Sequence, residues 1–120
     1  MYNINDTIVA VSSGATPSAK KIIRISGDKT FDILKILAED NHLHKQRKIV
    51  PASLKITEDF ASEAKLYLFP SPHSYTGDDL AEIHLFACEE TIELLLSTLS
   101  ALGSRIAQAG EFTYLSLIHL

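Results

Sequence analysis

The feature that most constrains the fold is a series of short segments rich in β-branched and aliphatic residues, interrupted by only two stretches of helical periodicity. Several of these segments alternate apolar with polar residues, and Gly or Pro residues stand close to the ends of several of them. This pattern is typical of β-strands that pair into a sheet. The predicted strands are residues 7–12, 21–26, 52–57, 64–69 and 80–86, with 105–108 as a candidate for a short final strand.

The two helical stretches complete the predicted element order. Asp28 is placed to cap a helix over 29–39, because its carboxylate can accept hydrogen bonds from the free amides of the first turn. In the second helix, Glu89 and Glu90 favour the positive N-terminal end, and Gly103 can supply the left-handed residue at the C-terminal end. The apolar stripes are Phe31, Leu34, Leu37 and Ala38 in the first helix and Ile92, Leu95, Leu96, Leu99 and Leu102 in the second. The order β-β-α-β-β-β-α, followed by the candidate last strand, predicts an α+β fold in which two helices cover a mixed β-sheet.

Length and composition restrict the class of protein. A chain of 120 residues is expected to form a single domain, residues 1–120. Its formal net charge is −4, whereas proteins that bind duplex nucleic acid usually carry an excess of basic residues. Cys88, the single cysteine, fits a reducing compartment. No apolar run approaches the roughly 20 residues of a membrane span, and the polar start at 1–6 does not resemble a signal peptide. We therefore expect a small cytoplasmic domain without a membrane segment.

The common nucleotide-binding patterns are absent from the sequence. It contains neither Gly-x-x-x-x-Gly-Lys-Ser/Thr nor Gly-x-Gly-x-x-Gly. The loop 14–21 has amides and lysines that could cradle an anion, although an ordinary solvated loop is the favoured interpretation. His42 and His44 have a spacing that some metal sites use, but the basic residues at 45–48 would repel a divalent cation, so we expect no metal site.

The remaining reactive groups give no catalytic arrangement. Cys88 stands at the predicted start of a helix, where Glu89 and Glu90 oppose thiolate formation, and we interpret it as an idle thiol. Asp78 and Asp79 form an acidic turn that we expect to be solvated. Catalysis within this chain is therefore not expected.

Arg24 and Glu82 form the strongest candidate site. Each lies on the polar face of a strand and is flanked by isoleucine or alanine residues. If the two strands are neighbours, both side chains point into one shallow site. There a carboxylate can accept two parallel N–H bonds from a pterin or guanine edge, and a guanidinium can bind a carboxylate or carbonyl. The simpler interpretation from the residues alone is a cross-strand ion pair on a wet face.

Three motifs, in matching order and spacing, resemble the N-terminal domain family of the tRNA modification GTPases known as MnmE or TrmE. The resemblance covers essentially the whole chain. The motifs are Asp6-Thr7-Ile8-Val9-Ala10 with Ile22-Ile23-Arg24-Ile25-Ser26-Gly27, then Ser74-Tyr75-Thr76-Gly77-Asp78-Asp79-Leu80-Ala81-Glu82-Ile83-His84, and Gly110-Glu111-Phe112-Thr113.

The resemblance implies a fold and a ligand. The family fold is a ββαβββα unit resembling half of a folate-binding aminomethyltransferase domain, and two subunits complete the platform as a homodimer. The implied ligand is a tetrahydrofolate derivative, the 5-formyl or methylene form, which serves as a one-carbon source. The folate-contacting arginine and glutamate of the family fall on Arg24 and Glu82.

The resemblance also implies a larger parent protein. In the family this domain precedes a helical domain with an inserted G domain, and GTP, Mg and K belong to that G domain. With a flavoprotein partner, MnmG, the parent modifies the wobble uridine of certain tRNAs in the cytoplasm. The chain itself carries no GTPase site.

Two alternatives remain open from the sequence. One is a pure dimerisation or interaction module that has lost folate binding. The other is a standalone folate-dependent group-transfer protein related to the aminomethyltransferases.

Overall fold

The computed structural model describes residues 3–12 and 20–118 of the chain. In these residues the elements follow the predicted order, with one helix added at the C-terminal end. They are β1 (Thr7–Val11), β2 (Lys20–Ser26), α1 (Thr30–Leu37), β3 (Lys48–Thr57), β4 (Phe60–Phe69), β5 (Leu80–Phe86), α2 (Glu89–Ala101), β6 (Ser104–Ile106) and α3 (Glu111–Ile118). The loop predicted at 14–18 lies outside the described residues.

Within the described part of the chain, the strands form one six-stranded sheet in the order β3-β4-β5-β2-β1-β6. The pairs β1–β2, β2–β5, β3–β4 and β4–β5 are antiparallel, whereas β1 and β6 are parallel. This arrangement confirms the predicted α+β fold with a mixed sheet. It also places β2 and β5, which carry the two candidate site residues, side by side at the centre.

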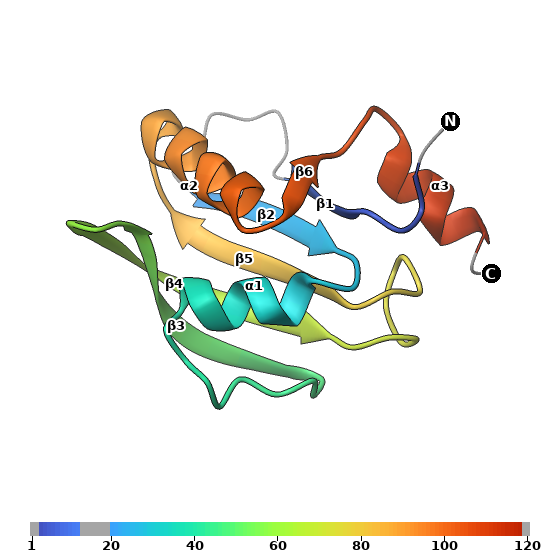
Figure 1. Ribbon diagram of the computed structural model, residues 1–120, viewed down its shortest axis with the longest axis horizontal. Coiled ribbons are helices and arrows are strands. Elements are labelled where there is room, and N and C mark those ends of the chain that lie inside the picture. The colour runs from blue at the N-terminus through green and yellow to red at the C-terminus, as the bar shows by residue number, and fades with distance from the viewer. Residues whose placement is uncertain (1–2, 13–19, 119–120) are drawn as a thin grey trace.

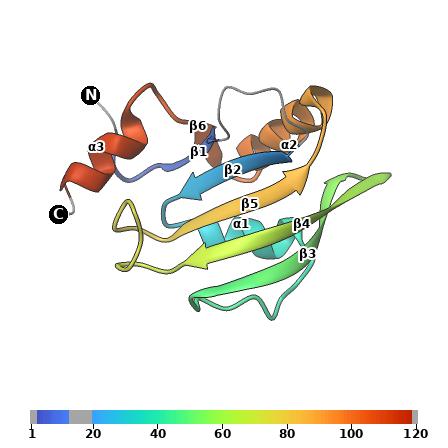
Figure 2. The ribbon, with the colours of Figure 1, turned by 180° about the vertical axis from the view of Figure 1, so that it is seen from behind.

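The helices α1 and α2 lie on the same face of the sheet (Figure 1). Alternation along the strands sends one set of side chains toward these helices and the other set to the opposite face, which the helices leave open (Figure 2). On β5, for example, Ala81, Ile83 and Leu85 are buried in the core, while Glu82 and His84 are half-buried on the open face. The fully buried core side chains include Ile23, Ile25, Phe31, Leu34, Leu54, Leu66, Ile83, Leu95 and Leu99.

The start of α1 differs from the prediction. Its N-cap is Lys29 rather than Asp28, and no side chain caps the helix there. The Lys29 N–H instead donates to Thr7 Oγ1 at 3.0 Å. The first residue of β1 thus satisfies an amide that a helix N-terminus leaves without a partner. The prediction that Asp28 caps the helix was wrong, because the helix begins one residue later and Thr7, a residue distant in sequence, accepts the Lys29 amide.

The hairpin of β3 and β4 is longer than predicted. Both strands have ten residues, and β3 includes Pro51. Proline removes one ladder donor, but β3 is an edge strand of the sheet, where that loss is tolerated. The polar loop expected over 40–48 is present up to the start of β3.

Helix α3 was not predicted. Figures 1 and 2 show it beyond the β1–β6 end of the sheet, next to the N-terminal segment. Of its eight residues, Glu111 and Leu115 are buried, and its apolar residues do not form a regular stripe. None of the helices in the described residues has the length and apolar character that crossing a membrane requires.

Candidate functional site

Arg24 and Glu82 lie directly opposite one another on the antiparallel strands β2 and β5. Arg24 Nη2 donates to Glu82 Oε2 at 2.8 Å, and Nε donates to the same oxygen at 3.2 Å. The two side chains lie on the open face, with 29% and 19% of their surfaces exposed. The structure therefore brings the two predicted site residues together in a cross-strand ion pair.

His84 extends this ion pair along β5. Its Nε2 lies 3.0 Å from Glu82 Oε1, so both carboxylate oxygens have a nitrogen partner. The ring of Tyr67 on β4 stacks on His84, with 3.9 Å between the ring centroids. Tyr67 is opposite Glu82 in the ladder, and the stack is a diagonal cross-strand contact.

The carboxyl group of Glu82 is held in its charged form. Burial is the largest single influence and by itself favours the neutral acid, but hydrogen bonds from Arg24 and His84 outweigh it and lower the pKa of Glu82. Because the ionised carboxylate only accepts hydrogen bonds, His84 donates to it from Nε2. A carboxylate with two oxygens has about four acceptor positions, so Glu82 keeps capacity for a further donor.

The guanidinium of Arg24 lies beside two aromatic rings. Its Cζ is 5.4 Å from the Tyr75 ring centroid and 5.9 Å from that of Phe112, distances at which a cation is attracted to a ring face. Hydrogen bonds with Ser116 and Thr113 of α3 lower the pKa of the Tyr75 hydroxyl. The loop before β5 and helix α3 thus meet at the Arg24 side chain.

Glu111 anchors α3 in this position. Its carboxylate is 1% exposed and accepts from Arg105 Nη1 and Nη2 at 2.8 and 2.6 Å. It also accepts from the backbone N–H of Gln108 at 2.9 Å. Arg105 Nε donates to Asp6 at 2.7 Å. The hydrogen bonds with Arg105 are the main cause that lowers the pKa of Glu111 and, in turn, Glu111 raises the pKa of Arg105. The ion pair joins β6, the N-terminal segment and α3, and sequence reasoning gave it no role although Glu111 belongs to one of the quoted motifs.

The loop between β4 and β5 is held by hydrogen bonds and an ion pair, and one of the residues involved, Asp79, was expected to be solvated. Asp79 is buried, accepts from the Ser71 amide at 2.9 Å and pairs with Lys45 at 2.9 Å. This ion pair raises the pKa of Lys45. Thr76 and Ser26 share a buried hydrogen bond of 2.7 Å. Asp79 therefore helps to hold the loop between β4 and β5, which carries Tyr75. The expectation that Asp79 is solvated was wrong.

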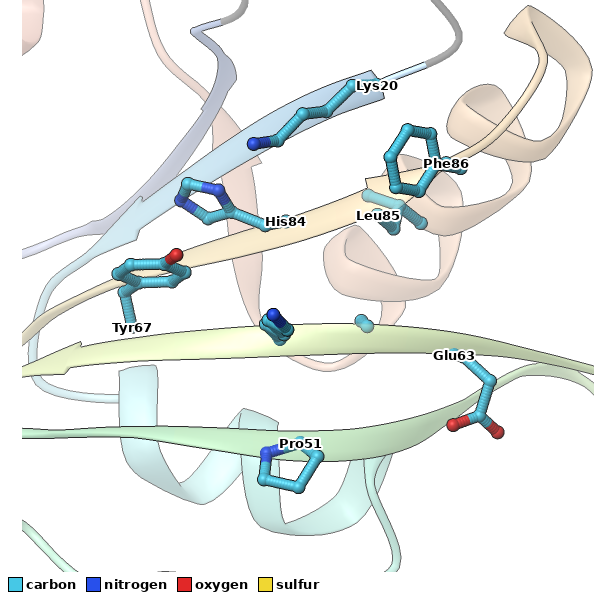
Figure 3. A pocket seen from close by; sticks show the side chains of 9 residues that line it. Lys20, Pro51, Glu63, Tyr67, His84, Leu85 and Phe86 are labelled. Atoms are coloured by element: carbon cyan, nitrogen blue, oxygen red, sulfur yellow. The ribbon is translucent and has the colours of Figure 1, made fainter.

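A pocket of about 460 Å³ lies on the open face, and His84, which contacts Glu82, is one of the residues that line it. Figure 3 shows His84 and Tyr67 on one side of it and Lys20 above them. The residues lining it are Lys20, Pro51, Glu63, Ala64, Lys65, Tyr67, His84, Leu85 and Phe86.

The other sequence candidates remain apart from this site. His42 and His44 are exposed. Across residues 3–12 and 20–118, no three His, Cys, Asp or Glu side chains come together in a way that could hold a metal ion. Cys88 is exposed, with Sγ 3.4 Å from Thr91 Oγ1 at the start of α2.

Comparison with known proteins gives a consistent result. The family model described as "GTP-binding protein TrmE N-terminus" matches residues 7–119. Proteins named "tRNA modification GTPase MnmE" from Bartonella quintana and Bartonella bacilliformis are 42% and 43% identical over 110 and 111 residues, and one of the same name from Brucella canis is 40% identical over 111. These matches cover 90–91% of the chain but 25% of each relative. The chain spans about a quarter of the length of these relatives.

Proposed function

Because the chain belongs to the TrmE N-terminal domain family, we propose that residues 1–120 act as the tetrahydrofolate-binding and homodimerising domain of a tRNA-modifying GTPase. The ligand is a 5-formyl or methylene form that supplies a one-carbon unit. In the larger protein, a separate G domain binds GTP, Mg and K. A flavoprotein of the MnmG kind and tRNA are the partners in wobble-uridine modification, in the cytoplasm.

The observation that supports folate binding is the pairing of Arg24 and Glu82 on an open sheet face. Glu82 is ionised and, with Arg24 donating twice and His84 once, keeps acceptor capacity for one further N–H donor, such as one on a pterin edge. Arg24 donates to Glu82 from Nε and Nη2, and Nη1 is not one of the donors to Glu82. The Tyr75 and Phe112 rings flank the guanidinium and offer flat surfaces next to the same site.

The open face also supports homodimerisation. It carries the exposed apolar side chains of Ile49 and Phe86, which are 56% and 75% exposed. A second subunit placed against this face would remove them from water, a change that favours association. The same observation favours the second candidate function, a dimerisation module without folate binding.

Calorimetric titration with 5-formyltetrahydrofolate tests the ligand. We expect saturable binding, and we expect Glu82→Gln to weaken it by about 10- to 100-fold, since a hydrogen bond to a charged group contributes about 1.5–3 kcal/mol. The matched control is Glu93→Gln on the exposed surface of α2, which should bind as the unmodified chain does. Absence of binding, or equal binding by Glu82→Gln, would contradict the proposed ligand site.

Sedimentation equilibrium on the same samples tests the assembly. A dimer that binds no folate selects the interaction module, and a monomer contradicts the homodimer. The standalone group-transfer alternative is tested by reading the coding sequence after Leu120. A Gly-x-x-x-x-Gly-Lys-Ser/Thr motif there would favour a GTPase parent.

A further inference from the structure

A second pocket, of about 450 Å³, lies where three segments meet at one end of the sheet. The segments are the last residues of the loop before β3, the end of β4 and the loop between β4 and β5, which Figure 2 shows at the same end of the sheet. The described residues that line it are Arg47, Phe69, Pro72, His73, Ser74 and Tyr75. None of these also lines the pocket beside His84, so the two pockets are separate.

Arg47 gives this second pocket its charge. Its side chain is exposed, and its Cζ lies 5.5 Å from the ring centroid of Phe69, a distance at which the ring attracts the cation. Among the described residues, no acidic side chain lines the pocket and no carboxylate forms an ion pair with Arg47. The guanidinium therefore keeps its N–H donors for an anion from outside the domain.

The segment that carries Arg47 is attached to the loop between β4 and β5. Lys45 pairs with the buried carboxylate of Asp79 at 2.9 Å, and Asp79 also accepts from the backbone N–H of Ser71 at 2.9 Å. The charge of Lys45 is thereby neutralised, but its contact holds both walls of the pocket in place. A site whose walls are already held loses less conformational freedom when a ligand binds.

The pocket combines its cation with flat side chains. Phe69, His73 and Tyr75 contribute rings, and 51% of Tyr75 is exposed. Proteins bind single-stranded RNA with this combination, because bases stack on aromatic rings and phosphates pair with arginine. An acidic peptide would use the cation but not the rings. The net charge of −4 opposes binding of a duplex, which depends on many phosphate contacts, more than it opposes stacking of one base.

We infer that this pocket binds a single-stranded segment of tRNA, with a base against Tyr75 and His73 and a neighbouring phosphate at Arg47. The inference rests on the tRNA part of the proposed function, since the wobble uridine lies in the single-stranded anticodon loop. The ring centroid of Tyr75 is also 5.4 Å from Cζ of Arg24. RNA held in the pocket therefore lies beside the proposed one-carbon site, and transfer of a group to a base requires this proximity.

Fluorescence anisotropy tests the inference with a labelled RNA hairpin that reproduces a tRNA anticodon stem–loop and with a fully paired duplex of equal length. We expect the hairpin to bind at least about fivefold more tightly, because stacking on the pocket needs an unpaired base. Arg47→Gln should weaken hairpin binding by about three- to tenfold. It should also reduce the slope of log affinity against log salt by about 0.7, the value for one phosphate contact on a single strand. His73→Ala should weaken binding without changing that slope.

The matched control is Lys55→Gln, which removes the same charge about 23 Å along β3 from Lys48, at 3.3 Å per residue. It should bind the hairpin as the unmodified chain does. No binding of the hairpin, equal binding of the duplex, or equal binding by Arg47→Gln and Lys55→Gln would each refute the RNA site. If polyglutamate displaces the hairpin as well as unlabelled hairpin of equal charge does, the pocket takes acidic peptides and the inference is overturned.

Titration of the same samples with 5-formyltetrahydrofolate separates this inference from the folate function. Arg47→Gln should bind the folate as the unmodified chain does, because Arg47 is not one of the groups that contact Arg24 or Glu82. Folate binding without hairpin binding would refute the RNA site and leave the folate function standing. Hairpin binding with the expected response of Arg47→Gln, but without folate binding, would support the RNA site and refute the folate function.

Discussion

Glu111 shows how one buried carboxylate can hold a helix whose sequence does not predict it. Its two oxygens accept hydrogen bonds from the Arg105 guanidinium and the backbone N–H of Gln108 in an almost fully buried position. A carboxylate in such a place needs this many donors, because burial of an unpaired charge is costly. The first turn of α3, and with it Phe112 beside Arg24, therefore depends on Glu111.

Glu111→Gln should lower the free energy of unfolding by about 1.5–3 kcal/mol, the usual contribution of hydrogen bonds to a charged group. Among the ion pairs of the described residues, Arg105 then loses its pair with Glu111 and keeps its pair with Asp6. Urea unfolding followed by circular dichroism measures the change. Glu93→Gln, an exposed carboxylate, is the control and should shift stability by less than about 0.5 kcal/mol. Equal midpoints for the two variants would contradict this role of Glu111.

Stability should fall as the solution becomes acidic, and Glu111 should account for much of the loss. Hydrogen bonds from Arg105 lower the pKa of this carboxyl in the folded state below the ordinary value of 4.5. The folded state therefore binds fewer protons than the unfolded chain around the ordinary value. The stabilisation is fully present above about pH 4.5 and is lost as the pH falls through the lowered folded pKa.

This pH dependence is measured by urea unfolding at several values between about pH 7 and pH 3. We expect a smaller loss of stability on acidification for Glu111→Gln than for the unmodified chain, because the variant has no proton to bind at this position. Glu82 has a lowered pKa in the folded state as well and should leave a residual acid sensitivity. Parallel curves for the variant and the unmodified chain would refute the assignment.

The turn between β2 and α1 is the element most restricted by backbone geometry. Gly27 has φ of +138°, a conformation that side chains disfavour, and an added Cβ would lie 2.5 Å from Thr7 Oγ1 and 2.6 Å from Thr7 Cα. Its N–H donates to the Asp79 carbonyl at 2.9 Å. This glycine thus lets β1, α1 and the loop before β5 approach one another closely.

Gly27→Ala should destabilise the chain by at least about 1–3 kcal/mol, the cost of a non-glycine residue in a sparsely populated backbone region. Thermal unfolding measures the effect, with Ser97→Ala on the exposed side of α2 as the control. Alanine is the better helix former, so the control should be neutral or slightly stabilising. A Gly27→Ala variant that unfolds at the temperature of the control would show that the turn relaxes without cost.

Elements with strong local periodicity were predictable from the sequence. Alternation located the central strands, and on β5 it assigned Glu82 and His84 to one face and Ile83 to the other, as the structure confirms. The stripe of leucines located α2. In each case the spacing of apolar residues within the element itself predicts which side chains are buried, so no knowledge of distant partners was needed.

Elements that depend on distant partners were not predictable. The partner of the Lys29 amide at the start of α1 is Thr7, more than twenty residues earlier. Helix α3 lacks an apolar stripe and is anchored through Arg105 and Glu111, whose pairing depends on how β6 lies beside β1. For the site, alternation predicted the shared face of Arg24 and Glu82, but the Tyr67–His84 stack required the strand order, which the sequence leaves undetermined.

At the scale of the whole molecule, the packing is uneven. The two central strands are covered on one face by α1 and α2 and are paired on both sides. Helix α3 instead lies at the end of the sheet, with Leu115 and Glu111 buried and Leu117 61% exposed. Local opening is governed by how many buried contacts an element must break, so α3 should open more readily than the sheet.

Hydrogen exchange measured by mass spectrometry tests this difference in local stability. We expect amides of β2 and β5 to exchange only on global unfolding, and amides of α3 to exchange faster through local opening. Glu111→Gln should accelerate exchange in α3 beyond any change in β5, because it removes the anchor of that helix alone. Measurements at two protein concentrations separate this effect from protection by a second subunit. Protection of α3 equal to that of β5, at both concentrations and in the variant, would show that the ion pair does not control the helix that meets Arg24.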